Sequence, residues 1–251
     1  LKLIEWLIRK NISLSDGVIC GNSKALDVIK PYLPDGFPSL VNPVSGMDTE
    51  RFKSGIYSDL ISRHGLKEKK VVLFVGAIDR RKGILKLVDA FLGARAEENS
   101  LHLLMIGSGP LDKELKRYVS EKGADRDITI LPWIDNKDLP GYFANSDIFV
   151  YPSQRYGGWE EQFGYSIAEA MSCGLPVVST KTGSIENIVV DDKTGILIEP
   201  EDVSALSRAI LKLAQDENLR KEMGAAGREF IINNFSHQII ASKLENFLRN
   251  L

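Results

Sequence analysis

The sequence has few of the residues that metal and disulfide chemistry require. Its two cysteines, Cys20 and Cys173, lie far apart in the chain and lack the spacing of metal ligands. Its three histidines, His64, His102 and His237, show no ligand spacing either. We interpret both cysteines as small buried apolar side chains in a reducing compartment, and the sequence predicts no metal site.

A strong charge imbalance and long apolar runs are also absent. The 32 lysine and arginine residues and 34 acidic residues give a net charge of −2, which offers no basic footprint for nucleic acid. No apolar run approaches the roughly 20 residues of a membrane span, and no signal-peptide pattern is present. Because the chain begins with Leu1 and not with methionine, we expect a fragment of a longer protein. With 43% apolar residues, we expect a folded cytoplasmic protein that binds a small molecule.

The first 14 residues have apolar positions at helical spacing and predict an amphipathic helix. Trp6 and the flanking charges are also typical of helices that lie on a membrane surface. We expect the helix to pack on a domain core, and a peripheral contact at the cytoplasmic face of a membrane is the alternative. The next segment predicts a strand at 17–20, a helix at 24–32 with Asn22 or Ser23 as N-cap, and a strand at 39–42.

From Lys70 onward, strand-like and helix-like patterns alternate regularly. Several strands are almost continuously apolar, as expected when helices cover both faces of a sheet. The sequence therefore predicts an α/β fold with a doubly wound, Rossmann-like parallel sheet and ligands at the carboxyl ends of its strands. Strands are predicted at 71–75, 101–106, 128–131, 148–151, 177–180 and 196–198, and helices at 83–97, 111–122, 137–145, 165–173 and 184–190, with three more over 202–251.

The stretch 161–178 contains a short helix with both ends marked. Gly164 lies where the chain turns into the helix, and Gly174 lies where it ends. The unpaired N–H groups of a helix N-terminus suit a phosphate group. Glu169 lies roughly 6 Å further along the axis, a depth that suits a ribose, and Glu161 lies on the other side of the phosphate. This arrangement predicts a nucleotide-sugar site, and the alternative is that both glutamates are solvated surface charges.

The same residues read Glu-x-Phe-Gly-x-x-x-x-Glu-Ala-Met-x-x-Gly-x-Pro-Val-Val. This pattern resembles the donor-binding signature of the retaining glycosyltransferases of family 4, which have the GT-B fold. The resemblance implies transfer of a hexose from a UDP- or GDP-sugar to a carbohydrate or lipid-linked acceptor, with retention of anomeric configuration and without a metal or other cofactor. It implies the end of the acceptor-side domain and a linker at 1–52, a donor-binding domain at 53–235 and a crossing helix at 236–251. Most of the N-terminal acceptor domain would then be missing.

By this resemblance Glu161 is the catalytic candidate and would hold hydroxyl groups of the sugar. The backbone N–H groups of residues 164–166 and the side chain of Lys82 would hold the diphosphate, and Glu169 the ribose. No side chain is assigned as nucleophile or base, so catalysis would be electrostatic and positional. The donor-binding residues that the resemblance implies are Arg81, Lys82, Ile134, Glu161, Phe163, Gly164, Tyr165, Ser166 and Glu169.

The chain departs from the family's pattern in two places. In the loop 75–83 the family's lysine is Lys82, but its arginine is replaced by Ala77, and Arg81 is our candidate substitute. Ser45 stands where the family has an asparagine in the phrase before the linker. The match to the family is therefore weaker at Ala77 and Ser45 than along the stretch 161–178.

Several strand-end loops allow more than one interpretation. Ile134 lies where the resembling family contacts the nucleotide base through backbone groups. Residues 107–110 are interpreted as a tight turn that forms a wall of the site. Residues 155–159 are longer than the family's spacing, and their aromatic side chains either shape the sugar pocket or acceptor entrance or belong to a loop that packs on itself. Ser184 is predicted to cap the helix that follows it.

Other functions match parts of the pattern. A nucleotide-sugar binding module without activity of its own, acting with a separate acceptor domain, is the alternative to an enzyme, and the loss of the arginine at Ala77 favours it. A nicotinamide-dependent dehydrogenase requires Gly-x-Gly-x-x-Gly after the first strand of the sheet, which the chain lacks. Asp125 and Asp127 have the Asp-x-Asp form that another glycosyltransferase fold uses for a metal, but we interpret them as part of a polar turn.

Overall fold

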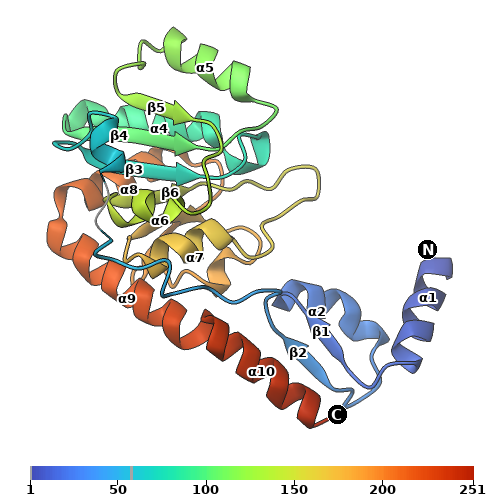
Figure 1. Ribbon diagram of the computed structural model, residues 1–251. Coiled ribbons are helices and arrows are strands. Elements are labelled where there is room, and N and C mark those ends of the chain that lie inside the picture. The colour runs from blue at the N-terminus through green and yellow to red at the C-terminus, as the bar shows by residue number, and fades with distance from the viewer. Residues whose placement is uncertain (1, 57–58) are drawn as a thin grey trace.

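A computed structural model describes residues 2–56 and 59–251 and contains a six-stranded parallel sheet (Figure 1). The strand order β5-β4-β3-β6-β7-β8 reverses between β3 and β6, as in a doubly wound fold. This confirms the predicted fold class. Leu1, expected to start the first helix, and residues 57–58 of the predicted donor domain lie outside the described residues. The strands are β3 (Lys70–Val75), β4 (Leu101–Ile106), β5 (Ile128–Leu131), β6 (Ile148–Tyr151), β7 (Val177–Thr180) and β8 (Gly195–Ile198).

Helices cover both faces of the sheet, which explains why its strands carry apolar residues at successive positions. Every residue of β4 is buried, and β3 pairs with it in register along six residues. The helices of this domain are α3 (Leu60–Arg63), η2 (Arg80–Lys82), α4 (Ile84–Glu97), α5 (Asp112–Glu121), α6 (Leu139–Ala144), α7 (Tyr165–Ser172), η3 (Ile185–Asn187), α8 (Val203–Gln215) and α9 (Glu217–Phe235).

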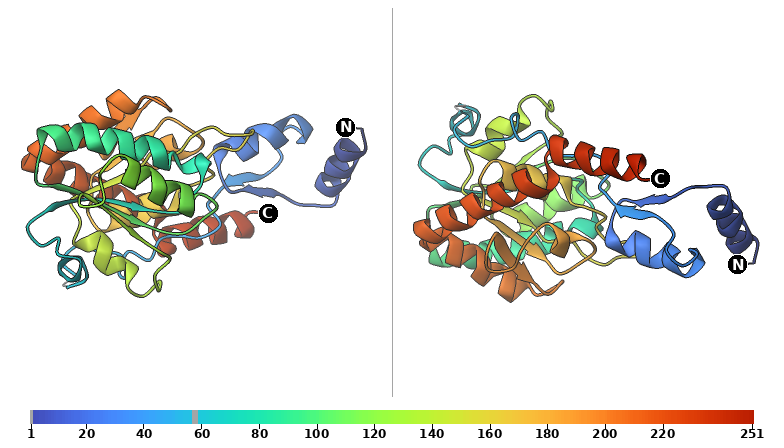
Figure 2. Two further views of the ribbon diagram at one scale, coloured as in Figure 1. Left: turned by 90° about the horizontal axis from the view of Figure 1, so that it is seen from above. Right: turned by 90° about the horizontal axis from the view of Figure 1, so that it is seen from below.

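A smaller unit at the N-terminal end extends away from the carboxyl ends of the sheet strands (Figures 1 and 2). It contains a parallel pair of short strands, and α1 lies at its far end. The last helix, α10 (His237–Arg249), runs from the end of α9 along this unit. The elements of the unit are α1 (Lys2–Ser13), β1 (Val18–Cys20), α2 (Ser23–Ile29), η1 (Lys30–Tyr32) and β2 (Ser39–Val41).

The two units are joined by two segments that are hydrogen-bonded to each other. Met47 donates its backbone N–H to the carbonyl of Phe235 at 2.7 Å, and His237 donates to the carbonyl of Met47 at 3.0 Å. Asn42, at the end of β2, donates a side-chain N–H to the carbonyl of Ile240 in α10 at 3.3 Å. The linker and the start of α10 therefore form one connection between the units.

Three sequence predictions are wrong in detail. The first helix forms, but it does not pack on a core, because Leu3, Ile4 and Trp6 are 69%, 62% and 54% exposed. A one-turn 3₁₀ segment, η3, replaces the α-helix predicted at 184–190, since the chain must return to β8 within a few residues. The helix predicted at 24–32 ends at Ile29 and continues as 3₁₀ turn η1, whose first positions include a proline.

Within the described ranges, no helix combines the length and apolar character that crossing a bilayer requires. The amphipathic α1 is a helix of only 12 residues.

Helices α7 and α9 approach so closely that one glycine has no room for a side chain. A Cβ atom on Gly224 of α9 would lie 1.9 Å from the carbonyl oxygen of Gly174, at the end of α7. One turn further along α9, a Cβ atom on Gly227 would meet the side chain of Met171 at 3.5 Å, an ordinary contact. The two glycines thus lie on the same buried face of α9 and differ in how closely another backbone approaches them.

We expect opposite effects from alanine at these two glycines. Gly224→Ala should lower the free energy of unfolding by about 1–3 kcal/mol, because the helices must separate. Gly227→Ala should raise it by up to about 1 kcal/mol, because alanine favours helix over glycine. Guanidinium unfolding monitored by circular dichroism measures both. If Gly224→Ala is as stable as Gly227→Ala, the packing of α7 on α9 is looser than described.

Candidate functional site

The candidate site begins at Lys82, the last residue of η2 in the loop that follows β3. Asp79 caps this turn by accepting the backbone N–H of Arg81 at 2.8 Å. The next residue, Gly83, lies so close to the loop after β6 that a Cβ atom would meet the carbonyl oxygen of Pro152 at 2.2 Å. This backbone contact brings Lys82 against the end of β6.

Lys82 forms a buried ion pair with Glu161. Its ammonium lies 2.5 Å from a carboxylate oxygen of Glu161 and donates a hydrogen bond of 2.5 Å to the hydroxyl of Tyr151. Lys82 and Glu161 are only 7% and 8% exposed. Because an isolated buried charge is costly, each residue fixes the position of the other. The structure thus brings together two residues that the sequence predicts to hold the diphosphate and the sugar.

The turn after β7 fixes the backbone of Glu161. Gly183 has a left-handed φ of 60°, and a Cβ atom on it would lie 2.0 Å from the carbonyl oxygen of Glu161. Ser184 donates its backbone N–H to the same oxygen at 2.8 Å. The prediction that the Ser184 side chain caps a helix is wrong: its hydroxyl is buried, as is that of Thr182, and neither has a hydrogen-bond partner in the described structure.

Helix α7 presents an open N-terminus beside this pair. The backbone N–H groups of Gly164, Tyr165 and Ser166 form no hydrogen bond within the described residues. A helix N-terminus with free N–H groups is suited to an anion. The Phe163 side chain is buried 5.4 Å from the ring of Phe235, so its own contribution to a ligand is limited to its backbone.

Tyr165 also connects α7 to the segment before the linker. Its hydroxyl accepts the backbone N–H of Ser45 at 3.2 Å. Ser45 stands at the position where the resembling family has an asparagine, so this departure from the pattern lies against the N-terminus of α7.

Glu169 lies one turn inside α7 and is half-buried. Its carboxylate has no hydrogen-bond or ion-pair partner in the part of the chain that the structure describes. Burial raises its pKa to about 7, and the charge of Arg51 lowers it only in part. Glu169 is therefore a poorly solvated carboxylate that a ligand hydroxyl would stabilise.

Arg81 and Ile134 occupy the other predicted positions. The guanidinium of Arg81 donates hydrogen bonds of 2.6 Å and 3.0 Å to the Asp79 carboxylate, and these bonds raise the Arg81 pKa. Ile134 follows β5 and is half-buried against the core, and its peptide groups form no hydrogen bond within the described residues. Arg81 is thus already paired, whereas the Ile134 backbone is available to a ligand.

A β-hairpin at 156–159 contributes a residue that the sequence prediction missed. Tyr156 and Trp159 exchange backbone hydrogen bonds of 3.2 Å and 2.9 Å around Gly157 and Gly158, whose φ values of 58° and 78° suit a tight hairpin turn. The turn places the Trp159 ring 4.4 Å from the Arg81 guanidinium carbon. The loop therefore does pack on itself, as one interpretation held, and it also covers the cations of the site. The sequence signal for this hairpin is the pair Gly157-Gly158, which favours a tight turn.

Within the described chain, no group of three or more histidine, cysteine or acidic side chains is arranged to hold a metal. Asp127 pairs with Arg95 at 3.1 Å, and Asp125 accepts a hydrogen bond of 2.6 Å from Ser120. The Asp-x-Asp residues are thus engaged in structural contacts. Metal independence itself stays a prediction.

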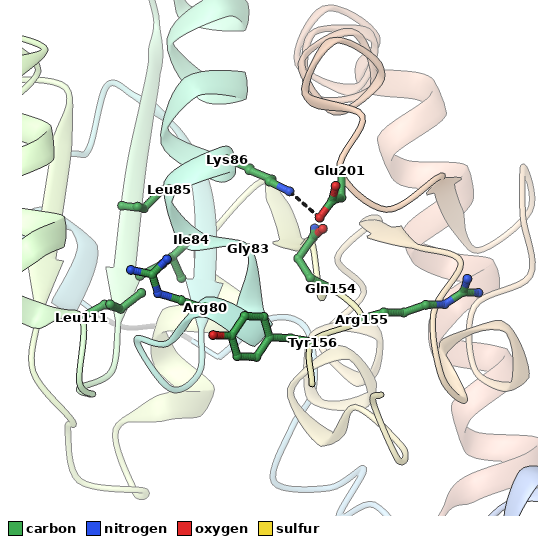
Figure 3. A pocket seen from close by; sticks show the side chains of 10 residues that line it. All are labelled: Arg80, Gly83, Ile84, Leu85, Lys86, Leu111, Gln154, Arg155, Tyr156 and Glu201. Atoms are coloured by element: carbon green, nitrogen blue, oxygen red, sulfur yellow. Dashed lines mark ion pairs between the residues drawn. The ribbon is translucent and has the colours of Figure 1, made fainter. Parts of the chain in front are cut away.

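A pocket of about 230 Å³ opens on the other side of the 80–83 loop (Figure 3). Its wall includes the first turn of α4, and an ion pair of 2.9 Å between Lys86 and Glu201 crosses its upper part. The predicted donor-binding residues do not line it. The Tyr156 side of the hairpin faces this pocket, whereas Trp159 faces the ion pair of Lys82.

The chain matches known proteins along most of its length. The model of the family described as glycosyl transferases group 1 matches residues 58–230. A GDP-mannose-dependent alpha-(1-6)-phosphatidylinositol monomannoside mannosyltransferase of Mycobacterium tuberculosis is 28% identical over 232 residues. That match covers 88% of this chain and 60% of the relative, so the chain spans about 60% of the relative's length.

Two solved structures share the fold over nearly the whole chain. The Anabaena protein HepE in complex with UDP has a TM-score of 0.85 at 21% identity, covering 98% of this chain and 68% of that one. Sucrose-phosphate synthase from Thermosynechococcus elongatus has a TM-score of 0.79 at 26% identity, covering 100% and 62%.

The raised pKa of Glu169 predicts a pH-dependent stability. Its pKa is about 7 in the folded protein, against 4.5 as the ordinary value, so between these values the folded state holds a proton that the unfolded state has lost. The free energy of unfolding should therefore fall as the pH rises through this window, by about 3 kcal/mol. Because glutamine does not titrate, Glu169→Gln should abolish this pH-dependent loss of stability.

We expect the stability gain of Glu169→Gln over the wild type to grow by about 2–3 kcal/mol between about pH 5 and pH 8. Urea unfolding at each pH measures it, and the exposed Glu222→Gln serves as control. A gain that does not change with pH would mean that the Glu169 carboxylate is well solvated.

Proposed function

This chain belongs to the glycosyl transferases group 1 family, and on that premise we propose that it binds the donor in the transfer of a hexose from a nucleoside diphosphate sugar to an acceptor. Its parallel sheet is the Rossmann-like sheet of the GT-B fold. The observation that carries the proposal is the meeting of Lys82 and Glu161 beside the open N-terminus of α7.

The proposed mechanism is electrostatic. The N–H groups at 164–166 and the Lys82 ammonium would bind the diphosphate and stabilise the negative charge that develops as the nucleoside diphosphate departs. Glu161 would orient the sugar through its hydroxyls, and Glu169 would accept hydrogen bonds from the ribose. The Ile134 backbone would contact the base. No side chain is required as a nucleophile in this scheme.

The stereochemistry, the metal requirement, the nucleotide carrier and the acceptor are also proposals. We propose retention of anomeric configuration and no metal requirement, on the resemblance of the 161–178 stretch to retaining enzymes. The carrier is proposed to be UDP or GDP: the name of the M. tuberculosis relative specifies GDP-mannose, and HepE was crystallised with UDP. The acceptor would be a carbohydrate or a lipid-linked sugar at the cytoplasmic face of a membrane.

We further propose that 1–52 is the end of an acceptor-side domain, 53–235 the donor domain and 236–251 the crossing helix. The exposed apolar side chains Leu3, Ile4 and Trp6 of α1 would then be covered by the remainder of the acceptor-side domain. Since the chain spans about 60% of the M. tuberculosis relative, that remainder would complete the site.

A second candidate is a nucleotide-sugar binding module without turnover of its own. Ala77 favours it, because the family's phosphate-binding arginine is absent and Arg81 is already paired with Asp79. Incubation of the chain with UDP- and GDP-hexoses, alone and with an acceptor domain, separates the two. Release of nucleoside diphosphate identifies an enzyme, and proton NMR of the transferred sugar tests retention. Binding without any release identifies a module.

We expect the chain to bind UDP or GDP in the presence of a chelator, as measured by isothermal titration calorimetry. Glu169→Ala should weaken this binding by about 1.5–3 kcal/mol, because one hydrogen bond to a charged group is lost. Glu222→Ala, which removes an exposed carboxylate of α9, should have no effect. Equal affinities of Glu169→Ala and the wild type would remove Glu169 from the nucleotide site, and loss of binding with chelator would contradict metal independence.

A further inference from the structure

The buried ammonium of Lys82 is surrounded by groups that bind a cation. Two of its three N–H donors have partners, the Glu161 carboxylate and the Tyr151 hydroxyl, both at 2.5 Å. The ammonium also lies 4.7 Å from the ring centroid of Trp159. Aromatic faces at this distance attract a cation, most strongly when the site is dry. Lys82 is therefore held in a cage of three groups: the Glu161 carboxylate, the Tyr151 hydroxyl and the Trp159 ring.

Trp159 is the least buried of the groups that hold Lys82. Tyr151 is buried at the end of β6 between the core rings of Phe74 and Phe149, whereas Trp159 is half-buried and sits on the hairpin. The hairpin is tied at its base by Glu160, which forms ion pairs with Arg155 and with Lys24 of α2. The ring thus covers Lys82 from a loop that also contacts the smaller unit.

A diphosphate and Glu161 need the same partner. Phosphate oxygens bind an ammonium as the carboxylate does, and two anions on one buried cation repel each other. Burial and the neighbouring Glu161 carboxylate raise the pKa of Tyr151 well above its usual value, so its hydroxyl stays neutral and cannot replace either anion. Glu161 and a bound diphosphate therefore compete for the Lys82 ammonium.

We infer that Trp159 is a positioning residue for Lys82, whose ring keeps the ammonium on Glu161 until a diphosphate displaces both the ring and the carboxylate. This inference rests on the proposed function of the site. The inference also applies to Glu161. When Lys82 binds the diphosphate, the Glu161 carboxylate requires new hydrogen-bond donors, and the hydroxyls of a bound sugar supply them. A nucleoside diphosphate without a sugar leaves Glu161 unpaired and should bind less favourably.

The first test is calorimetric titration of Glu161→Gln with UDP and GDP. Without the competing carboxylate, we expect the diphosphate that binds the wild type to bind this variant about tenfold more tightly. The gain should be smaller for the corresponding UDP- or GDP-hexose, because the variant has lost a sugar contact. Unchanged or weaker binding of the free diphosphate would overturn the inference and leave the proposed function standing.

The second test follows Trp159 itself and does not depend on the folding of Glu161→Gln. In a Trp6→Phe, Trp133→Phe background, Trp159 is the remaining tryptophan of the chain. We expect the bound diphosphate to change its emission and to increase quenching by acrylamide. A ring with a purely structural role would leave both unchanged at saturating ligand, which would overturn the inference.

Two substitutions of Trp159 distinguish the packing of its side chain from the attraction of its ring for Lys82. Trp159→Leu should strengthen binding of the free diphosphate about threefold, because a cation–π contact that opposes release of Lys82 is removed. Trp159→Phe keeps an aromatic face and should restore wild-type affinity. Weaker binding by both variants would overturn the inference. If calorimetry detects no diphosphate binding by the wild type or by any variant, the proposed function fails and the inference fails with it.

Discussion

The ion pair between Lys82 and Glu161 depends on backbone-to-backbone contacts between neighbouring loops at the carboxyl edge of the sheet. The loop after β3 touches the loop after β6 at Gly83, and the turn after β7 touches Glu161 at Gly183, each at a distance that excludes a side chain. Two opposite charges with less than a tenth of their surface exposed are stable only when their partners are held in place. Because β3, β6 and β7 are neighbours in the sheet, the loops that follow them lie in contact and hold the two charged residues in place.

The two glutamates of the site show how one residue type acquires different properties. Glu161 has a cation at 2.5 Å, whereas Glu169 has no partner in the described structure and a pKa raised by burial to about 7. A carboxylate of the first kind is neutralised within the protein, and one of the second kind is left for a ligand to solvate. The N-terminus of α7 lies next to both, so a ligand with a phosphate between two hydroxyl-bearing groups matches the charge pattern of the site.

The sheet was predictable because its strands are short apolar runs bounded by polar turns. The predicted bounds of β4, β5, β6 and β7 agree with the structure, since burial on both faces leaves a continuous signal. Lys82 and Glu161 were proposed as site residues from their motif, but their mutual contact was not predicted, because it joins residues 79 apart in the chain. The contact of the Trp159 ring with Arg81 likewise joins loops that follow different strands. The pairing of Arg81 with Asp79 is local to one turn and was not predicted either. The exposure of α1 was missed because an amphipathic pattern does not specify what covers its apolar side.

The paired connection between the two units limits how they can move. The linker crosses at Met47 and the chain returns at Ser236, and the two crossings run side by side as a parallel bridge. A Cβ atom on Gly46 would lie 2.7 Å from the backbone of His237, so the two crossings are in direct backbone contact. The units also meet at α2, where Lys24 pairs with Glu160 and Asn22 donates a hydrogen bond to Gln162, so the two places of contact together oppose rotation as well as translation. Any rotation of the smaller unit about the crossings would have to break the ion pair between Lys24 and Glu160, at the base of the hairpin that carries Trp159.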